Sequence, residues 1–150
     1  MGCMICDRIE MIKGGTNPYF VMELETGYVV MGDHQHFKGY TLFLCKIHVT
    51  ELHYLEKDFK LQFLYEMSLV AEAVYNVFHP EKMNYELLGN GDTHLHWHLF
   101  PRRTGDTPTK GSVWLMPFEE MYDDKNRPSE DELNNMKELL EKEITRLISL

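Results

Sequence analysis

Short runs of apolar, β-branched and aromatic residues occur along the first 90 residues of the chain and predict strands. These runs stand between clusters of Gly, Asn, Asp and Pro, the residues that favour turns. The strand segments that we expect are 19–24, 28–31, 40–45 and 83–88. Glu25-Thr26-Gly27 separates the first two and is typical of a hairpin. The third run is almost wholly apolar, which indicates a buried strand.

A fifth strand is predicted within segment 90–103, NGDTHLHWHLFPRR. There, His94, His96 and His98 alternate with leucine and tryptophan. Successive side chains of a strand point to opposite faces, so all three imidazoles would line one face. On a helix, histidines two residues apart would be about 200° apart and would form no row. The apolar residues between them suit a central strand, and Pro101, which lacks an N–H, is expected to end it.

Apolar residues recur every three or four positions in two longer segments, which predicts helices that bury one face. The first helix is expected over about 58–79, before Pro80. Its apolar stripe comprises Phe63, Leu64, Met67, Val70, Ala71, Val74, Val77 and Phe78. The second helix follows Ser129, which forms a capping box with Glu132. Its stripe comprises Leu133, Met136, Leu140, Ile144 and Leu147.

Three smaller features complete the local predictions. A short helix over 7–13 is expected to end at two consecutive glycines. Thr50 is expected to cap the short turn that follows the third strand. Farther along the chain, Trp114 and Phe118 are expected to pack against the body of the protein, because large aromatic side chains gain most from burial.

Five strands with short connections, one long helix and a C-terminal helix predict an α+β protein with a mostly antiparallel five-stranded sheet. A chain of 150 residues is a one-domain length and can bury roughly 70% of the surface that it would expose unfolded. The composition, 43% hydrophobic and 26% charged, is that of an ordinary globular protein. We therefore expect one domain over 1–150, in which residues 111–150 form a C-terminal helical extension.

The formal net charge of −9 argues against a nucleic-acid backbone as a partner, because proteins that bind one carry concentrated positive charge. A small anionic ligand would need local cations, for which Arg102 and Arg103 are the candidates. No apolar run approaches the ~20 residues of a membrane helix, so no membrane is expected as a partner. Arg8, Glu10 and Lys13 would interrupt the apolar core of a signal peptide, and we therefore expect a cytoplasmic protein.

Three imidazoles in a row have two chemical uses. They can bind a metal ion, or they can act as nucleophile, acid and base, because unperturbed histidine titrates near pH ~6.5. A row of metal ligands would normally include an acidic residue, and Asp92 lies nearby in the sequence. A polar strand face without chemistry is the plainer interpretation. Three histidines at a strict period of two disfavour it.

The three cysteines predict no disulfide framework, since their number is odd and no secretion signal is expected. Cys3 and Cys6 form a Cys-x-x-Cys pair, which is compatible with a redox pair, half of a metal site or two incidental thiols. Zinc sites usually need four ligands. His48, which follows the strand that ends near Cys45, and His94 could complete a Cys2His2 set.

The histidine stretch resembles the signature of the HIT (histidine triad) superfamily, His-φ-His-φ-His-φ-φ, in which φ is apolar. Residues 94–100, HLHWHLF, fit every position. Residues 46–49, Lys-Ile-His-Val, resemble the family's Lys-x-His-Val segment. The order of strands and helices also resembles the HIT fold over about residues 1–105. The resemblance implies a HIT-like domain that forms a homodimer.

The resemblance also bears on the cysteine pair. Some HIT proteins hold zinc with an N-terminal cysteine pair, a histidine after the third strand and the first triad histidine. A structural zinc ion on Cys3, Cys6, His48 and His94 is therefore implied here. Bound in this way, His94 would not be a free acid. In the alternative role, His94 orients the network around the phosphate.

The activity implied by the resemblance is that of a nucleotide hydrolase or nucleotidyl transferase. Its substrate would be a dinucleoside polyphosphate or nucleoside phosphoramidate, attacked at the α-phosphate. His96 would be the nucleophile and carry a covalent nucleotidyl group. His98 would contact phosphate oxygens and assist the departing group, and His94 is the third catalytic candidate. Substrate contacts are expected from Asn90, Asp92 and Thr93 near the phosphate and leaving group, and from Asp33 at the ribose.

The chain departs from the family pattern in two places. Gly39-Tyr40 stands where the family has Gly-His before the third strand, and the approach to the triad is only Asn90-Gly91-Asp92-Thr93. Asp92 brings negative charge toward an anionic substrate, which requires a positive partner. Two other functions therefore stay open. The protein could bind a metal with the histidine row itself, or bind a nucleotide without turnover.

Overall fold

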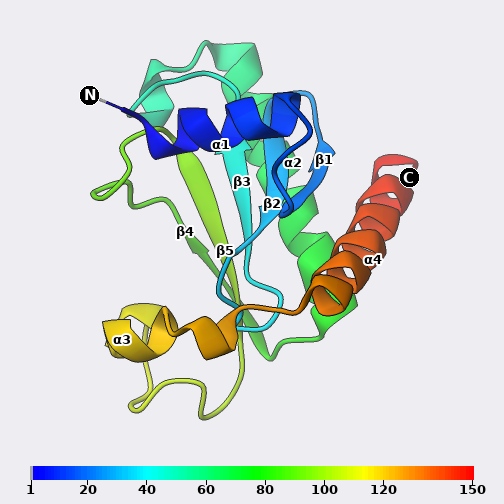
Figure 1. The fold of residues 1–150 in the computed structure, drawn as a ribbon. Coiled ribbons are helices and arrows are strands. Elements are labelled where there is room, and N and C mark those ends of the chain that lie inside the picture. Colours follow the sequence, from blue (N-terminus) through cyan, green and yellow to red (C-terminus); the bar gives the residue numbers. More distant parts are fainter. Residues whose placement is uncertain (1) are drawn as a thin grey trace.

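The sheet at the centre of the fold has five antiparallel strands in the order β1-β2-β3-β5-β4 (Figure 1). The computed structural model describes residues 2–150, so Met1 lies outside the described residues. The strands are β1 (Phe20–Glu23), β2 (Gly27–Met31), β3 (Thr41–Cys45), β4 (Lys82–Glu86) and β5 (His96–Arg102). The predicted α+β class with an antiparallel sheet is confirmed, and the histidine strand is an interior one.

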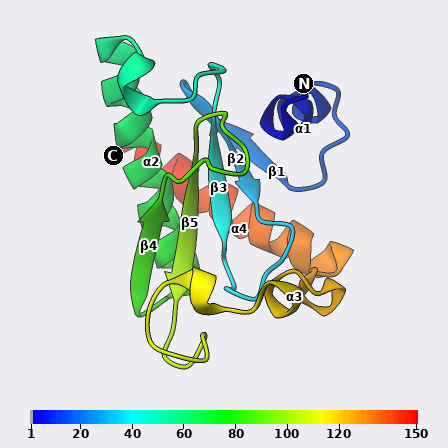
Figure 2. The ribbon, with the colours of Figure 1, turned by 90° about the vertical axis from the view of Figure 1, so that its left-hand side faces the viewer.

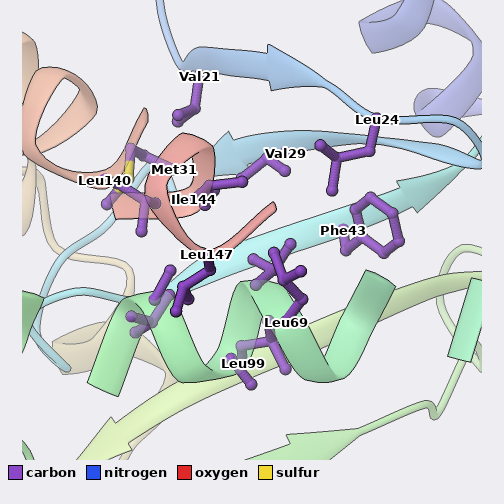
Figure 3. Close-up of a cluster of buried hydrophobic side chains, with 14 of the residues drawn as sticks. Val21, Leu24, Val29, Met31, Phe43, Leu69, Leu99, Leu140, Ile144 and Leu147 are labelled. Atoms are coloured by element: carbon purple, nitrogen blue, oxygen red, sulfur yellow. The ribbon is translucent and has the colours of Figure 1, made fainter. Parts of the chain in front are cut away.

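One face of the sheet is covered by α2 (Lys57–Phe78) and α4 (Glu130–Ile148), which enclose the main core. Figure 3 shows side chains of the strands and of both helices converging there. The predicted stripe of α2 is buried at its centre, and it is partly exposed at Leu64, Met67, Val77 and Phe78. The periodicity therefore identified the buried side of this helix correctly, although its margins reach the surface.

The C-terminal helix α4 matches its prediction closely. Ser129 and Glu132 form the capping box in both directions, and all five residues of the predicted stripe are buried. The remaining surface of the helix is mostly polar, although Leu139 and Ile148 are exposed there. Across residues 2–150, no helix has the combination of length and apolarity that crossing a bilayer requires.

The opposite face of the sheet is covered in two separate places. The short helix α1 (Met4–Lys13) packs buried isoleucines against β2 and β3. Near the far end of β5, residues 103–129, which we call the strap and which include α3 (Phe118–Met121), add a further apolar cluster. In Figure 2, which looks onto this face, α4 passes behind the strands. His96 and His98 lie on the part of this face between α1 and the strap.

The histidine strand differs from its prediction at both ends. It begins at His96, so His94 lies in the bend before it. Pro101 does not end the strand, which runs on to Arg102. The pairing explains this, since β3 pairs with β5 no farther than Leu99, and Pro101 lies opposite only Met83 of β4. A proline that faces a partner on one side alone is tolerated in a sheet.

Two other local predictions are wrong, and one is confirmed in part. Thr50 caps nothing, because the 3₁₀ turn Leu52–Tyr54 begins one residue later and has no side-chain cap. Phe118 does not pack on the body, since it is 72% exposed at the start of α3. Trp114 packs only in part, because its ring lies edge-on to Phe100 but stays 43% exposed. The difference shows that aromatic character alone does not predict burial in an irregular segment.

Candidate active site and metal centre

The register of β5 directs two histidines to the face that carries α1. His96 lies opposite Leu44 and His98 opposite Leu42, both in β3. Leu44 belongs to the cluster under α1, whereas Trp97 packs against the main core on the other face. The predicted alternation is therefore present within the strand, and it presents two adjacent imidazoles on a rigid interior element.

The hydrogen bonds of His96 determine which of its nitrogens carries the proton. Its Nδ1 lies 2.6 Å from the carbonyl oxygen of His94. A carbonyl can only accept, so Nδ1–H must donate to it. The proton of a neutral imidazole is thereby placed on Nδ1, and Nε2 keeps its lone pair. His96 is buried, which holds this arrangement away from bulk water.

His98 continues this chain of hydrogen bonds. Its Nε2 lies 3.1 Å from Nε2 of His96, and its Nδ1 lies 2.6 Å from the hydroxyl of Tyr40. Because His96 offers a lone pair there, Nε2–H of His98 donates to it, and Nδ1 accepts the Tyr40 O–H. Burial, followed by the positive charge that His96 would carry, lowers the pKa of His98 to about 4. His98 is therefore neutral at pH 7.

The side chain of His94 faces away from this pair, toward the N-terminal cysteines. Its Nδ1 is 3.5 Å from Sγ of Cys3 and 3.4 Å from Sγ of Cys6. Nδ1 of His48 lies 3.1 Å from Nδ1 of His94 and 3.2 Å from Sγ of Cys6. The four ligand atoms all lie within 4.8 Å of one another. Helix α1 contributes to this closeness, because the Cys3 side chain caps it by accepting from the Cys6 N–H.

These separations fit a tetrahedral zinc ion. Bonds of about 2.3 Å to sulfur and about 2.0–2.1 Å to nitrogen place tetrahedral S···N corners about 3.6 Å apart and N···N corners about 3.3 Å apart. The orientation of His94 also fits, since its Nε2–H donates to the carbonyl oxygen of Cys45 at 2.7 Å and leaves the Nδ1 lone pair for a metal. Burial lowers the pKa of His94 and so favours this neutral, ligating form.

Two pockets meet at His96. The first, of about 250 Å³, is mostly apolar and extends from His96 and His98 under α1 to the strap, where Tyr122 lines it. The second, of about 600 Å³, lies between the turn after β3 and the loop before β5, and Lys60 lines it. A side chain between two hollows can face two parts of one ligand at once.

The predicted substrate contacts divide between these pockets. Asp33 and Asp92 line the first, and Asn90 and Thr93 line the second. Asp33 also pairs in bidentate fashion with Arg8 of α1, at 2.9 and 3.1 Å. Its carboxylate is thus partly committed to the protein. The sequence offered no signal for Arg8, because nothing local links α1 to the loop that follows β2.

Arg102 and Arg103 do not serve as the predicted local cations. Arg102 is buried and makes a bidentate pair with Asp106 at 2.8 and 2.9 Å. The guanidinium of Arg103 donates to the carbonyl oxygens of Lys38 and Phe78. Both arginines therefore anchor loops at the far end of β5. Among the described residues, the cations that line the two pockets are Arg8 and Lys60.

Comparison with known proteins identifies the fold. The model of the HIT domain matches residues 17–105, more than half of the chain. The chain belongs to the HIT domain family. Membership supports a function in nucleotide binding, hydrolysis or transfer at a general level. The matched range includes the histidine strand and His48, whereas the cysteine pair and nearly all of the strap lie outside it. No curated protein sequence matches the chain significantly.

Solved HIT structures superpose on nearly the whole chain. A histidine triad protein from Sinorhizobium meliloti has a TM-score of 0.73 at 21% identity and covers 83% of this chain and 87% of its own. One from Marinobacter aquaeolei has a TM-score of 0.72 at 22% identity, with coverages of 85% and 89%. A Zn-bound family protein from Mycobacterium smegmatis has a TM-score of 0.68 at 21% identity, with coverages of 99% and 97%. At these identities the likeness shows the fold.

Proposed function

We propose that this HIT protein is a nucleotide-conjugate hydrolase or nucleotidyl transferase that acts at the α-phosphate. The intermediate would be a covalent nucleotidyl group on His96. Substrates of this class are dinucleoside polyphosphates and nucleoside phosphoramidates. Family membership supports the general class, and the two histidines of β5 support the reaction.

The observation that carries the proposal is the unprotonated Nε2 of His96, whose lone pair accepts a hydrogen bond from His98 in the absence of substrate. The hydrogen bond from Nδ1–H to the His94 carbonyl keeps the nucleophilic nitrogen unprotonated. His96 lines both pockets. The apolar pocket would receive the nucleoside, with Asp33 near the ribose. The second pocket would receive the leaving group, with Asn90 and Thr93 as polar contacts.

The reaction would proceed in two displacements. In the first, the Nε2 lone pair of His96 attacks the α-phosphorus, and the bond from phosphorus to the leaving oxygen or nitrogen breaks. His98, neutral at pH 7, donates its Nε2 hydrogen bond to the phosphate or the departing atom, which takes its proton from solvent. In the second, water attacks phosphorus, releases a proton to solvent and frees His96 with its lone pair restored.

Asp92 has a defined place in this proposal. It lines the pocket that also holds His96 and His98, and Arg8 lines the same pocket. Since Arg8 already pairs with Asp33, Asp92 would contribute by accepting hydrogen bonds from the substrate within the nucleoside pocket rather than by attracting the phosphate. His94 would take part through its backbone, because its carbonyl orients His96, rather than as a free acid.

Cys3, Cys6, His48 and His94 would hold a structural zinc ion. When bound, the ion would link the start of α1 to the segment after β3 and to the bend before β5. The row of three triad histidines fits a metal less well. Nε2 of His94 is held by Cys45 and its Nδ1 by the cysteine cluster, so His94 cannot share an ion with His96 and His98.

A labelling experiment tests the proposal. The protein is mixed with a panel of dinucleoside polyphosphates and nucleoside phosphoramidates, and its intact mass is measured after acid-free quenching. The expected result is the added mass of one nucleotidyl group per chain, mapped to His96 in a peptide digest. Binding without any added mass or turnover across the panel would instead favour the non-catalytic nucleotide-binding protein.

Four further expectations accompany the proposal. We expect a homodimer, which sedimentation would reveal, in the cytoplasm, which cell fractionation would test. We also expect neither nucleic acid nor a membrane as a partner. Residues 111–150 would act as a C-terminal extension of one HIT domain. Shared cooperative unfolding of α4 and the sheet would support this last expectation.

A further inference from the structure

Tyr40 occupies an unusually constrained place beside the proposed active site. It is the residue before β3, and its ring stacks on Phe100 at 4.1 Å between centroids and on His98 at 5.9 Å. Gly32 makes room for this ring, because a Cβ at that position would clash with it. The backbone of Tyr40 is held too, by an N–H to carbonyl bond from Gly32 at 2.8 Å.

The hydroxyl of Tyr40 faces one ring nitrogen of His98. Its hydroxyl is 2.6 Å from Nδ1 of His98. Burial raises the pKa of Tyr40 well above its ordinary range, so the O–H keeps its proton. The charged or titratable groups around it, Tyr122, Asp33 and Glu86, act in the same direction. The hydroxyl therefore always has a proton to donate toward Nδ1 of His98.

We propose that Tyr40 is a positioning residue that holds His98 as its Nε2–H tautomer, so that His98 enters the reaction as a neutral donor to the departing group. The inference rests on the proposed function for its catalytic consequence, whereas the tautomer can be tested alone. If Nδ1 carried the proton instead, the Nε2 lone pairs of His98 and His96 would face each other at 3.1 Å. Tyr40 removes that arrangement by occupying Nδ1.

The identity of the residue also matters. The resembled family pattern has histidine at this place, and an unperturbed histidine titrates near pH ~6.5. A tyrosine donor does not change its charge in that range. The use of Tyr40 would therefore make the tautomer of His98 independent of pH across the neutral range.

The first measurement is spectroscopic and needs no substrate. Nitrogen-15 NMR of the histidine rings distinguishes protonated from unprotonated nitrogens. Wild-type His98 is expected to show Nε2–H alone from pH 6 to 8. Tyr40→Phe keeps the ring but removes the hydroxyl, and it should produce a mixture of tautomers and raise the pKa of His98, because a hydrogen bond to the neutral form is lost. Tyr28→Phe, which removes a hydroxyl elsewhere on the same sheet face, should change neither.

The second measurement is kinetic and compares two nucleotide substrates, one with a poor alkylamine leaving group and one with a good nitrophenolate leaving group. Tyr40→Phe should slow labelling by the poor one roughly 10-fold, the effect of losing one hydrogen bond, and by the good one less than twofold. Equal slowing on both, with the wild-type tautomer retained, would overturn the inference in favour of a packing role. An unchanged tautomer and unchanged rates would overturn it too. Absence of labelling in the wild type would count against the proposed function, while the spectra would still decide the role of Tyr40.

Discussion

The two histidine sites of this protein begin from the same residue type, four residues apart, and end in different chemistry. His94 lies in the bend before β5 and turns its Nδ1 to Cys3 and Cys6. His98 lies within β5 and turns its Nε2 to His96. Burial lowers the pKa of both histidines, so both are neutral at pH 7. Neither the residue type nor its charge state therefore separates a metal ligand from a catalytic donor.

The metal ligand and the catalytic donor differ in the group that hydrogen-bonds to the ring nitrogen not used for the role. A backbone carbonyl can only accept, so Cys45 forces Nε2–H on His94, and His94 in turn forces Nδ1–H on His96. At His98, Nε2 faces the lone pair of His96 and Nδ1 faces a tyrosine hydroxyl that can donate, so the proton is on Nε2. The remaining nitrogen is a lone pair at the candidate metal site, a lone pair at the proposed nucleophile and a donor at His98. Each role follows from a neighbour on another part of the chain or on the backbone.

The largest expected effect concerns the nucleophile. His96→Ala should abolish nucleotidyl labelling and lower turnover on the order of 10⁴-fold or more, because no other group supplies the attacking nitrogen. His96→Gly should recover part of the turnover when imidazole is added. His98→Ala should instead lose about 10²–10⁴-fold and still label with a good leaving group. Wild-type turnover in His96→Ala would show that His96 is not the nucleophile. The contrast between a metal-binding and a catalytic histidine site would then fail.

The next effect concerns the metal site. Cys6→Ser should lose bound zinc, measured by metal analysis of the purified protein. If zinc stands about 1,000-fold above its dissociation constant, this removes about 4 kcal/mol of stability and lowers the Tm by about 10 °C. Cys45→Ser is the matched control. Cys45 is buried behind the cluster without belonging to it, so this variant should keep its zinc. Equal zinc content in all three proteins would contradict the site.

A smaller effect tests whether the core can be weakened without touching either site. Leu140 of α4 is fully buried on the far face of the sheet. Leu140→Ala should cost about 2–5 kcal/mol of unfolding free energy, measured by urea denaturation. Zinc content and labelling at low temperature should stay at their wild-type values. Loss of zinc in this variant would mean that the cluster depends on the whole core rather than on its four ligands.

The smallest effect is the share of the pH dependence of stability that His98 contributes. His98 has a pKa of about 4 in the folded protein, against about 6.5 when unfolded. The unfolded chain thus binds more protons below pH ~6.5, so this contribution to stability is present above that pH and is lost as the pH falls toward 4. Between pH 7 and pH 5 the loss should be about 2 kcal/mol. His98→Gln should show a correspondingly shallower decline, and an equal decline would contradict the assignment.

Much of the architecture was predictable because it depends on near neighbours in the sequence. The stripe of α4, its capping box and the alternation of His96 with Trp97 each rest on residues one to four positions apart. Helical and strand periods translate such spacings directly into faces. The same local logic explains two errors. The expected role of Pro101 rested on the conformational preference of proline alone, but the pairing of β3 with β5 decides where a proline is tolerated. The expected cap at Thr50 rested on the preference of threonine, but the 3₁₀ turn begins after Glu51.

The sequence by itself determined that histidines would stand on one face of an interior strand and that a cysteine pair would be available nearby. Only the tertiary structure decided how those histidines divide. Cys3 and His94 are 91 residues apart, and Tyr40 and His98 are 58 apart. No local pattern encodes which nitrogen such distant groups will face. Hydrogen bonds require atoms about 3 Å apart in a defined direction, and only the packed sheet supplies that precision.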